Sequence, residues 1–123
     1  MTDYTSTLII GANGQLAKAM QQQYPSARAV GHNELDLCNA AAIATFDWSG
    51  VTTIINTAAY TNVDGAETAE GRTAAWRINA QAVGQLARIC SERDITLVHV
   101  SSDYVFDGET APHTEDELFS PLS

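Results

Sequence analysis

Basic side chains are scarce in this chain. Only 6 of its 123 residues are Lys or Arg, against 15 Asp or Glu, and the formal net charge is -9. The six are scattered along the sequence rather than gathered into a patch. Because nucleic acids and anionic membranes attract a concentrated positive surface, this composition argues against both as partners. A nucleotide ligand is still allowed, because backbone N–H groups can bind phosphate without basic side chains.

Cysteine is equally rare, and long apolar runs are missing. Cys38 and Cys90 lie far apart without C-x-x-C spacing, which favours two buried thiols over a disulfide or a metal site. No apolar run reaches the length of a membrane span. The first residues, MTDYTST, have neither the basic nor the apolar region of a secretory signal, so we expect a cytoplasmic protein. With 45% hydrophobic residues, the chain suffices for one domain, spanning 1–123.

The most informative stretch is TLIIGANGQLA, residues 7–17. Apolar residues run into a glycine turn at 11–14, and a helical pattern begins at Gln15. A strand, a glycine turn and a helix in this order direct free N–H groups and the positive end of a helix dipole to one place, which suits a phosphate. Gly11 allows the tight turn, Gly14 the approach of a pyrophosphate, and Ala17 close packing of the helix on the strand. The spacing G-x-x-G-x-x-A departs from the common dinucleotide fingerprint, so alone it fits a plain turn equally well.

The alternation of strand and helix patterns predicts a doubly wound parallel sheet. Apolar, β-branched runs without polar alternation indicate strands that are buried on both faces. We expect strands over 7–10, 27–31, 35–37, 51–57 and 95–100, and helices that begin at Gln15, after Asn39 and at about Thr68, the last ending at Arg93. Such βαβ units give an α/β fold of the Rossmann type, with about five strands and helices on both faces. From Ser101 onward the sequence is typical of a loop.

Unusual polar residues follow three of these strands, as GANG (11–14), NTAAYT (56–61) and SSDY (101–104). Ligands bind at the carboxyl ends of parallel strands where the strand order reverses, so we expect a site there. Each segment also has a plainer explanation, either a tight helix contact or a Ser/Asp turn. Asn79, in the middle of a helical pattern, either faces solvent or hydrogen-bonds to the backbone of this site. His99 is expected to be a core histidine.

These segments resemble the extended short-chain dehydrogenase/reductase family, and within it the dTDP-4-dehydrorhamnose reductases. The match is carried by GANGQLA (11–17), ELDL (34–37), INTAAYTNVDGAE (55–67), NAQAVGQLA (79–87) and VSSDYVFDG (100–108). The resemblance covers the whole chain. It implies an oxidoreductase that reduces the 4-keto group of dTDP-4-dehydro-6-deoxy-L-mannose to dTDP-L-rhamnose, by hydride transfer from NAD(P)H. The regulatory subunit of methionine adenosyltransferase resembles the same reductases, so a non-catalytic NADP-binding regulator stays open.

By position, the resemblance assigns roles to individual residues. The pyrophosphate of the cofactor would lie on Gly11, Gly14, Gln15 and Leu16. Asp36 and Leu37 would flank the adenine, and the ribose and nicotinamide side would be lined by Ala59, Tyr60 and Thr61. Ser102 stands at the Ser/Thr position of the catalytic triad and would orient the substrate carbonyl, while Asp103 would contact the dTDP-sugar.

Two positions depart from the family pattern. Where the family often has an acid after its second strand, this chain has Gly31-His32. Without a carboxylate to repel a 2′-phosphate, NADP(H) is favoured over NAD(H), with His32 as a contact. The proton-donating Tyr of the Tyr-x-x-x-Lys motif would come just after Ser123. We therefore expect an amino-terminal portion of a reductase, inactive alone, whose uncovered sheet edge favours homo-oligomers.

Overall fold

A parallel sheet lies at the centre of the fold. The computed structural model describes residues 2–122 and contains four strands in the order β2-β1-β3-β4. The strands are β1 (Thr7–Ile10), β2 (Arg28–Val30), β3 (Thr53–Asn56) and β4 (Thr96–His99). Their last residues are aligned, because Ile10 pairs with both Val30 and Asn56, and Asn56 pairs with His99. All four strands therefore end along one line, and the segments that follow them share one edge of the sheet.

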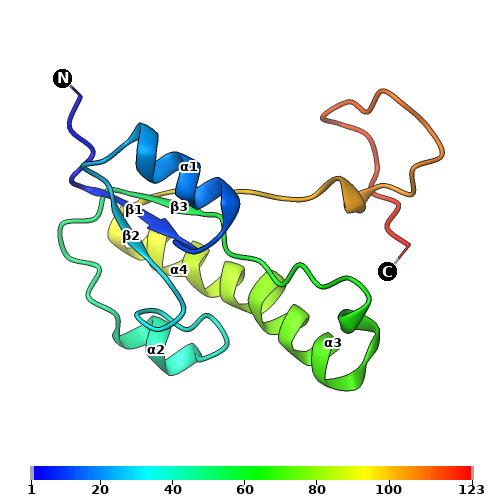
Figure 1. The fold of residues 1–123 in the computed structure, drawn as a ribbon, viewed down its shortest axis with the longest axis horizontal. Helices are drawn as coiled ribbons and strands as arrows, with labels where there is room; N and C mark the ends of the chain where they lie inside the picture. Colours follow the sequence, from blue (N-terminus) through cyan, green and yellow to red (C-terminus); the bar gives the residue numbers. More distant parts are fainter. Residues whose placement is uncertain (1, 123) are drawn as a thin grey trace.

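Helices cover both faces of this sheet (Figure 1). Helix α1 (Gln15–Gln23) lies on one face, where Ile9 and Ala17 are fully buried. Helices α2 (Ala40–Thr45) and α4 (Ala82–Arg93) lie on the other. Successive strand residues point to opposite faces, so Leu8 and Ile10 join the larger core that α2 and α4 cover. The predicted doubly wound α/β fold is confirmed.

The strand predicted at 35–37 is wrong, and the sheet has four strands rather than about five. Leu35 and Leu37 are buried and Asp36 is exposed, which is the alternation that a strand would show. The segment is a turn instead. The Leu35 N–H donates to the Gly31 carbonyl, and the Asp36 carboxylate accepts the Cys38 N–H at 2.9 Å. The two leucines enter the core from this turn without a strand partner.

A continuous helical run connects β3 to β4. A short 3-10 turn (Gly65–Glu67) precedes α3 (Ala69–Trp76), a π turn (Arg77–Gln81) follows, and α4 completes the run. The helix predicted over 68–93 is confirmed in extent, and the π turn within it is new. At its carboxyl end, Asp94 adopts a left-handed conformation with φ of 55°, and its N–H donates to the Cys90 carbonyl. Burial raises the pKa of the Cys90 thiol.

The chain beyond β4 leaves the sheet and folds back on itself (Figure 1). It contains one short 3-10 turn, Asp103–Val105, within the described residues. The Ser120 N–H donates to the Val105 carbonyl at 2.8 Å, which closes the loop. On the edge strand β4, Val98 is 46% exposed and the following Val100 43% exposed. The apolar edge expected from the sequence is present, and association of copies through it stays a prediction.

Replacing Asp94 by glycine is expected to stabilise the fold by about 1 kcal/mol, because glycine adopts the left-handed conformation without the Cβ contact that other residues make there. Urea unfolding of the two proteins measures the difference. Asp94→Ala is the matched control and should not stabilise the chain. If Asp94→Gly is less stable than the wild type, the left-handed backbone at this position is not the source of a stability cost.

Candidate functional site

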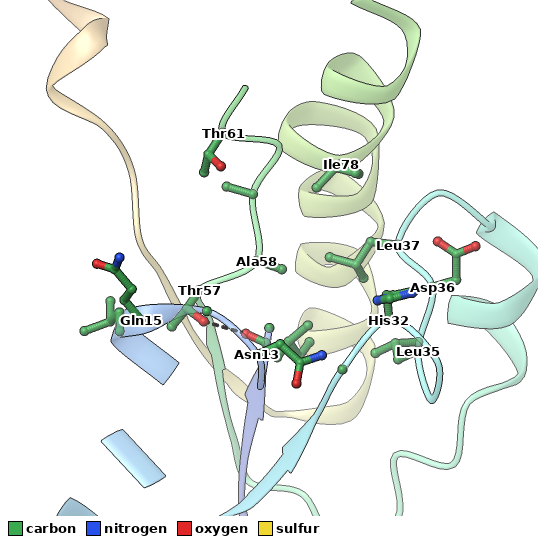
Figure 2. A pocket seen from close by; sticks show the side chains of 16 residues that line it. Asn13, Gln15, His32, Leu35, Asp36, Leu37, Thr57, Ala58, Thr61 and Ile78 are labelled. Carbon is green, nitrogen blue, oxygen red and sulfur yellow. Dashed lines mark hydrogen bonds between the residues drawn. The ribbon is translucent and has the colours of Figure 1, made fainter. Parts of the chain in front are cut away.

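A pocket of about 670 Å³ lies at the carboxyl ends of β1, β2 and β3. Four segments line it, from 10–16, 31–37, 57–61 and the π turn, which contributes Ile78. Figure 2 shows Gln15 and Thr57 on one side of this pocket and His32 and Asp36 on the other. Because the strand order reverses at β1, with β2 on one side and β3 on the other, the pocket lies at the position where doubly wound sheets bind their ligands.

The glycine turn and the end of β3 approach so closely that no side chain fits between them. Gly11 has φ of +96°, and a Cβ on it would lie 2.8 Å from the Thr57 Oγ1 and 2.9 Å from the Ala58 nitrogen. Thr57 binds the Ile10 carbonyl through both its N–H, at 3.0 Å, and its hydroxyl, at 2.8 Å. On the other side, the Gly11 N–H donates to the Val30 carbonyl at 3.0 Å. The turn is therefore fixed to both neighbouring strands.

Helix α1 begins at this turn and opens into the pocket. Its N-cap is Gly14, which provides no side-chain acceptor for the first turn of the helix. The intrahelical bonds start only with the Lys18 N–H, which donates to the Gly14 carbonyl. The N–H groups of the first turn thus have no intrahelical acceptor, and groups of this kind at the positive end of a helix dipole are able to bind an anion. Leu16, in this turn, is 46% exposed and lines the pocket.

The segment after β2 forms the opposite wall. His32 and Asp36 are exposed, and both line the pocket together with the buried Leu35 and Leu37. Gly31 lies under the Asn13 side chain, since a Cβ on it would come within 3.0 Å of the Asn13 Nδ2. Among the described residues that line the pocket there is no Lys or Arg, so an anion bound there would be held by backbone N–H groups and by His32.

The segment after β3 forms the third wall and is held by two asparagines. The Oδ1 of the fully buried Asn56 accepts the Ala58 N–H at 3.2 Å. Asn79 binds Tyr60 twice, accepting its N–H at 2.8 Å and donating to its carbonyl at 3.1 Å. The predicted hydrogen bond from Asn79 to the backbone of the site is therefore confirmed.

His99 is not the core histidine expected from the sequence. It is exposed, because it ends the edge strand β4. The Asn56 Nδ2 lies 3.3 Å from the His99 Nδ1. An amide nitrogen can only donate, so the His99 Nδ1 is the acceptor in this contact.

The pocket brings together most of the residues to which the sequence assigned a cofactor role. Nine of the ten line it: Gly11, Gly14, Gln15, Leu16, His32, Asp36, Leu37, Ala59 and Thr61. Tyr60 does not, because its hydroxyl turns toward Gly65 and Gly71, where an added Cβ would lie 2.7 and 2.8 Å from the phenolic oxygen. The cofactor role of these residues stays a prediction.

Ser102 and Asp103 lie outside the pocket, in the segment after β4. Both are exposed, and the Ser102 hydroxyl accepts the Tyr104 N–H at 3.2 Å and lies 3.5 Å from an Asp103 carboxylate oxygen. The simpler expectation of a Ser turn therefore describes their geometry in this structure. Since β4 is next to β3, the segment starts on the side of the pocket opposite His32.

Seven further residues line the pocket to which the sequence assigned no cofactor contact: Ile10, Asn13, Gly31, Leu35, Thr57, Ala58 and Ile78. Asn13, Thr57 and Ala58 lie within the segments 11–14 and 56–61, where the sequence predicted a site without assigning these three residues a contact. For Ile78, the sequence pattern predicted only a place on the apolar face of a helix. Within residues 2–122, no group of three His, Cys, Asp or Glu side chains is placed to hold a metal ion, and none of the helices could cross a membrane.

Comparison with known proteins agrees with this geometry. The family model described as RmlD substrate binding domain matches residues 5–123. The dTDP-4-dehydrorhamnose reductase of Mycobacterium tuberculosis is 40% identical over 108 residues, which cover 83% of this chain and 34% of the relative. A dTDP-4-keto-6-deoxy-D-glucose reductase of Streptomyces niveus is 34% identical over 122 residues, covering 94% of this chain and 42% of the relative. The chain spans less than half the length of these curated relatives.

Solved structures share the fold. A dTDP-4-dehydrorhamnose reductase from Bacillus anthracis in complex with NADP matches with a TM-score of 0.84 and 32% identity, covering 94% of this chain and 43% of that chain. A hypothetical dTDP-4-dehydrorhamnose reductase from Sulfolobus tokodaii matches with a TM-score of 0.83 and 33% identity, over 94% of this chain and 46% of that chain. The chain is thus related to sugar-nucleotide reductases, and it belongs to the RmlD substrate-binding domain family.

Proposed function

We propose that the pocket binds NADP(H) and forms the cofactor site of a reductase that acts on the 4-keto group of a dTDP-4-dehydro-6-deoxy sugar. The observation that carries the proposal is the glycine turn, which presents the amino end of α1 to a pocket that continues along the carboxyl ends of β2, β1 and β3. An extended ligand with a pyrophosphate at its centre fits a pocket that has the glycine turn in its middle and the segments after β2 and β3 at its two ends. The NADP held by the Bacillus anthracis relative supports the choice of ligand.

The pyrophosphate lies at the glycine turn, and the two halves of the cofactor extend to either side. The free N–H groups at the start of α1 bind its oxygens. The adenosine half extends toward Asp36 and Leu37, and the nicotinamide half toward Ala59 and Thr61. The backbone supplies most of the binding energy for the anion, which explains how a chain with a net charge of -9 can hold a phosphorylated ligand.

The substrate lies on the β4 side of the pocket. When bound, NADPH supplies the hydride to the carbonyl carbon. Ser102 donates a hydrogen bond to the carbonyl oxygen and orients it, and Asp103 accepts a hydrogen bond from the sugar. Both side chains are exposed and can turn toward a ligand, since their contacts in this structure lie within residues 102–104. The Tyr of the family's Tyr-x-x-x-Lys motif would donate the proton to the carbonyl oxygen.

The pyrophosphate position is tested by Leu16→Glu. A carboxylate in the first turn favours the helix, so the fold should be kept, but it competes with the bound anion for the same N–H groups. We expect the NADPH dissociation constant, measured by calorimetry, to rise about tenfold or more, since close like charges cost over 1 kcal/mol. Ala19→Glu adds the same charge to α1 away from the pocket and should leave binding unchanged. If Leu16→Glu and Ala19→Glu bind NADPH with the same affinity, the pyrophosphate does not lie at the start of α1.

The preference for NADP(H) is tested by His32→Asp. A carboxylate at this position repels a 2′-phosphate and accepts a hydrogen bond from a free ribose hydroxyl. We expect NADPH affinity to fall about tenfold or more, while NADH affinity holds or rises. Asn33→Asp is the control, because Asn33 is exposed and next in sequence but does not line the pocket. If His32→Asp loses affinity for NADPH and NADH to the same degree, the result would argue against a 2′-phosphate at His32.

The reductase activity is tested on the native polypeptide that contains this sequence. With NADPH and dTDP-4-dehydro-6-deoxy-L-mannose, the absorbance of the reduced nicotinamide should fall. Ser102→Ala should lower kcat about a hundredfold without changing NADPH affinity, because a single oriented donor to the reacting oxygen contributes about that much. NADPH binding without turnover of the wild-type protein would favour a non-catalytic regulator.

A further inference from the structure

We infer that His113 is a positioning residue that holds the substrate side of the site in place and makes its affinity for the sugar nucleotide depend on pH. It acts on the turn that carries Ser102 and Asp103. The inference rests on the proposed function, because it takes these two residues as the substrate contacts from there. It goes further by assigning a role to the loop at 106–120, which lies apart from the sheet and lines no part of the cofactor pocket (Figure 1).

This loop is closed at its base, beside the turn of Asp103. Ser120 closes it, because its N–H donates to the Val105 carbonyl at 2.8 Å and its hydroxyl accepts the Asp107 N–H at 3.2 Å. The first residue of the loop is bonded to the turn itself, since the Phe106 N–H donates to the Asp103 carbonyl at 3.0 Å. A change in the course of Phe106 therefore reaches the Asp103 backbone directly.

The ring of Phe106 is held by two other rings of the loop. The His113 ring lies parallel to it, with centroids 3.9 Å apart and 6° between the planes. Phe119 meets the same ring edge-on, at a centroid distance of 6.1 Å. Neutral aromatic pairs prefer larger separations, offset or edge-to-face, whereas a cation is attracted to the face of an aromatic ring. The close parallel stack therefore suits a His113 that carries a positive charge.

The same imidazole pairs with a carboxylate. The His113 Nδ1 lies 2.9 Å from the Glu117 Oε2, and the two side chains are 27% and 32% exposed. An ionised carboxylate can only accept, so Nδ1 is the donor in this contact. Partial shielding from water strengthens a charged pair relative to one on an open surface. Both contacts of the ring are thus strongest when His113 is protonated.

No lysine or arginine shares this part of the chain with His113. The last one in the sequence is Arg93. The loop contains five carboxylates, of which only that of Glu117 reaches His113 within the described residues. The other four belong to Asp107, Glu109, Glu115 and Asp116. When His113 loses its proton, these carboxylates repel one another without a positive charge among them, so the loop loosens.

The direction of the pH effect follows from these contacts. Histidine side chains change charge between about pH 5 and 8. The contacts that need a charged His113 are present at the lower end of this range and are lost as the pH rises. Their loss frees Phe106 and, through its N–H, the Asp103 backbone, so the KM for the sugar nucleotide rises. The affinity for NADPH does not follow, because the loop lines no part of its pocket.

The experiment compares the native polypeptide that contains this sequence with three variants at about pH 6 and about pH 8.5. Between these values, the KM for dTDP-4-dehydro-6-deoxy-L-mannose should rise about fivefold more in the wild type than in His113→Phe, which keeps an aromatic ring beside Phe106 but carries no charge. Glu117→Gln should lie between the two. Glu109→Gln is the matched control, because it removes a carboxylate of the same loop that does not reach His113, and it should behave like the wild type.

Hydrogen–deuterium exchange reports on the loop without requiring activity. After correction for the intrinsic exchange rate at each pH, the amides of Phe106 and Ser120 should lose protection at the higher pH in the wild type. In His113→Phe, their protection should be the same at both pH values. The NADPH dissociation constant is measured in parallel and should be the same for all four proteins at each pH.

The combined results decide between positioning and a general effect of pH. Changes of KM and exchange with pH in the wild type and Glu109→Gln, both absent in His113→Phe, support the inference. The same pH dependence of KM in the wild type and His113→Phe overturns it, and so does a loss of NADPH affinity that follows His113. Failure of the wild type to reduce the sugar nucleotide contradicts the proposed function, and the positioning role falls with it. If His113→Phe does not fold, Glu117→Gln decides the outcome.

Discussion

The structure depends on the contact between Gly11 and the end of β3. At this point the backbone of the glycine turn lies against Thr57 and Ala58 with no space for a Cβ. The close approach lets β1 turn at once into α1, and it brings the amino end of that helix beside the loop that follows β3. A larger residue would separate the two segments and open the pocket. The site is therefore built mainly from backbone, with side chains setting its edges.

This construction is compatible with an anionic ligand in an acidic protein. Most of the 15 acidic side chains lie elsewhere, and Asp36 is the only one that lines the pocket within the described residues. Peptide dipoles at the start of α1 are fixed by the fold, so they are already oriented before a ligand arrives. In the proposed function, the choice among ligands would depend on a few exposed side chains on either side, such as His32 and Ser102.

Much of the fold follows from local sequence, and the failures have physical causes. The apolar runs at 7–10 and 51–57 identified strands, because a strand buried on both faces needs no polar alternation. The segment at 35–37 alternates like a strand, yet strand formation needs a partner, and a turn buries the same leucines. His99 follows an apolar run, and only the strand order reveals that β4 is at the edge. Of the nine predicted cofactor residues that line the pocket, Gly11 and Gly14 followed from the glycine-turn pattern itself, and most of the others from the family resemblance. The outward direction of Tyr60 and the π turn depend on packing between distant segments, which local patterns do not encode.

The aligned strand ends have an evolutionary consequence. Because β2 and β4 lie at opposite edges of the sheet, the segments that follow them start on opposite sides of the pocket. A lineage can therefore change the loop after one strand without a compensating change in the loop after the other. A strand order of this kind lets the two ends of the pocket change independently around a common central turn, so new binding preferences can arise by single, separable steps.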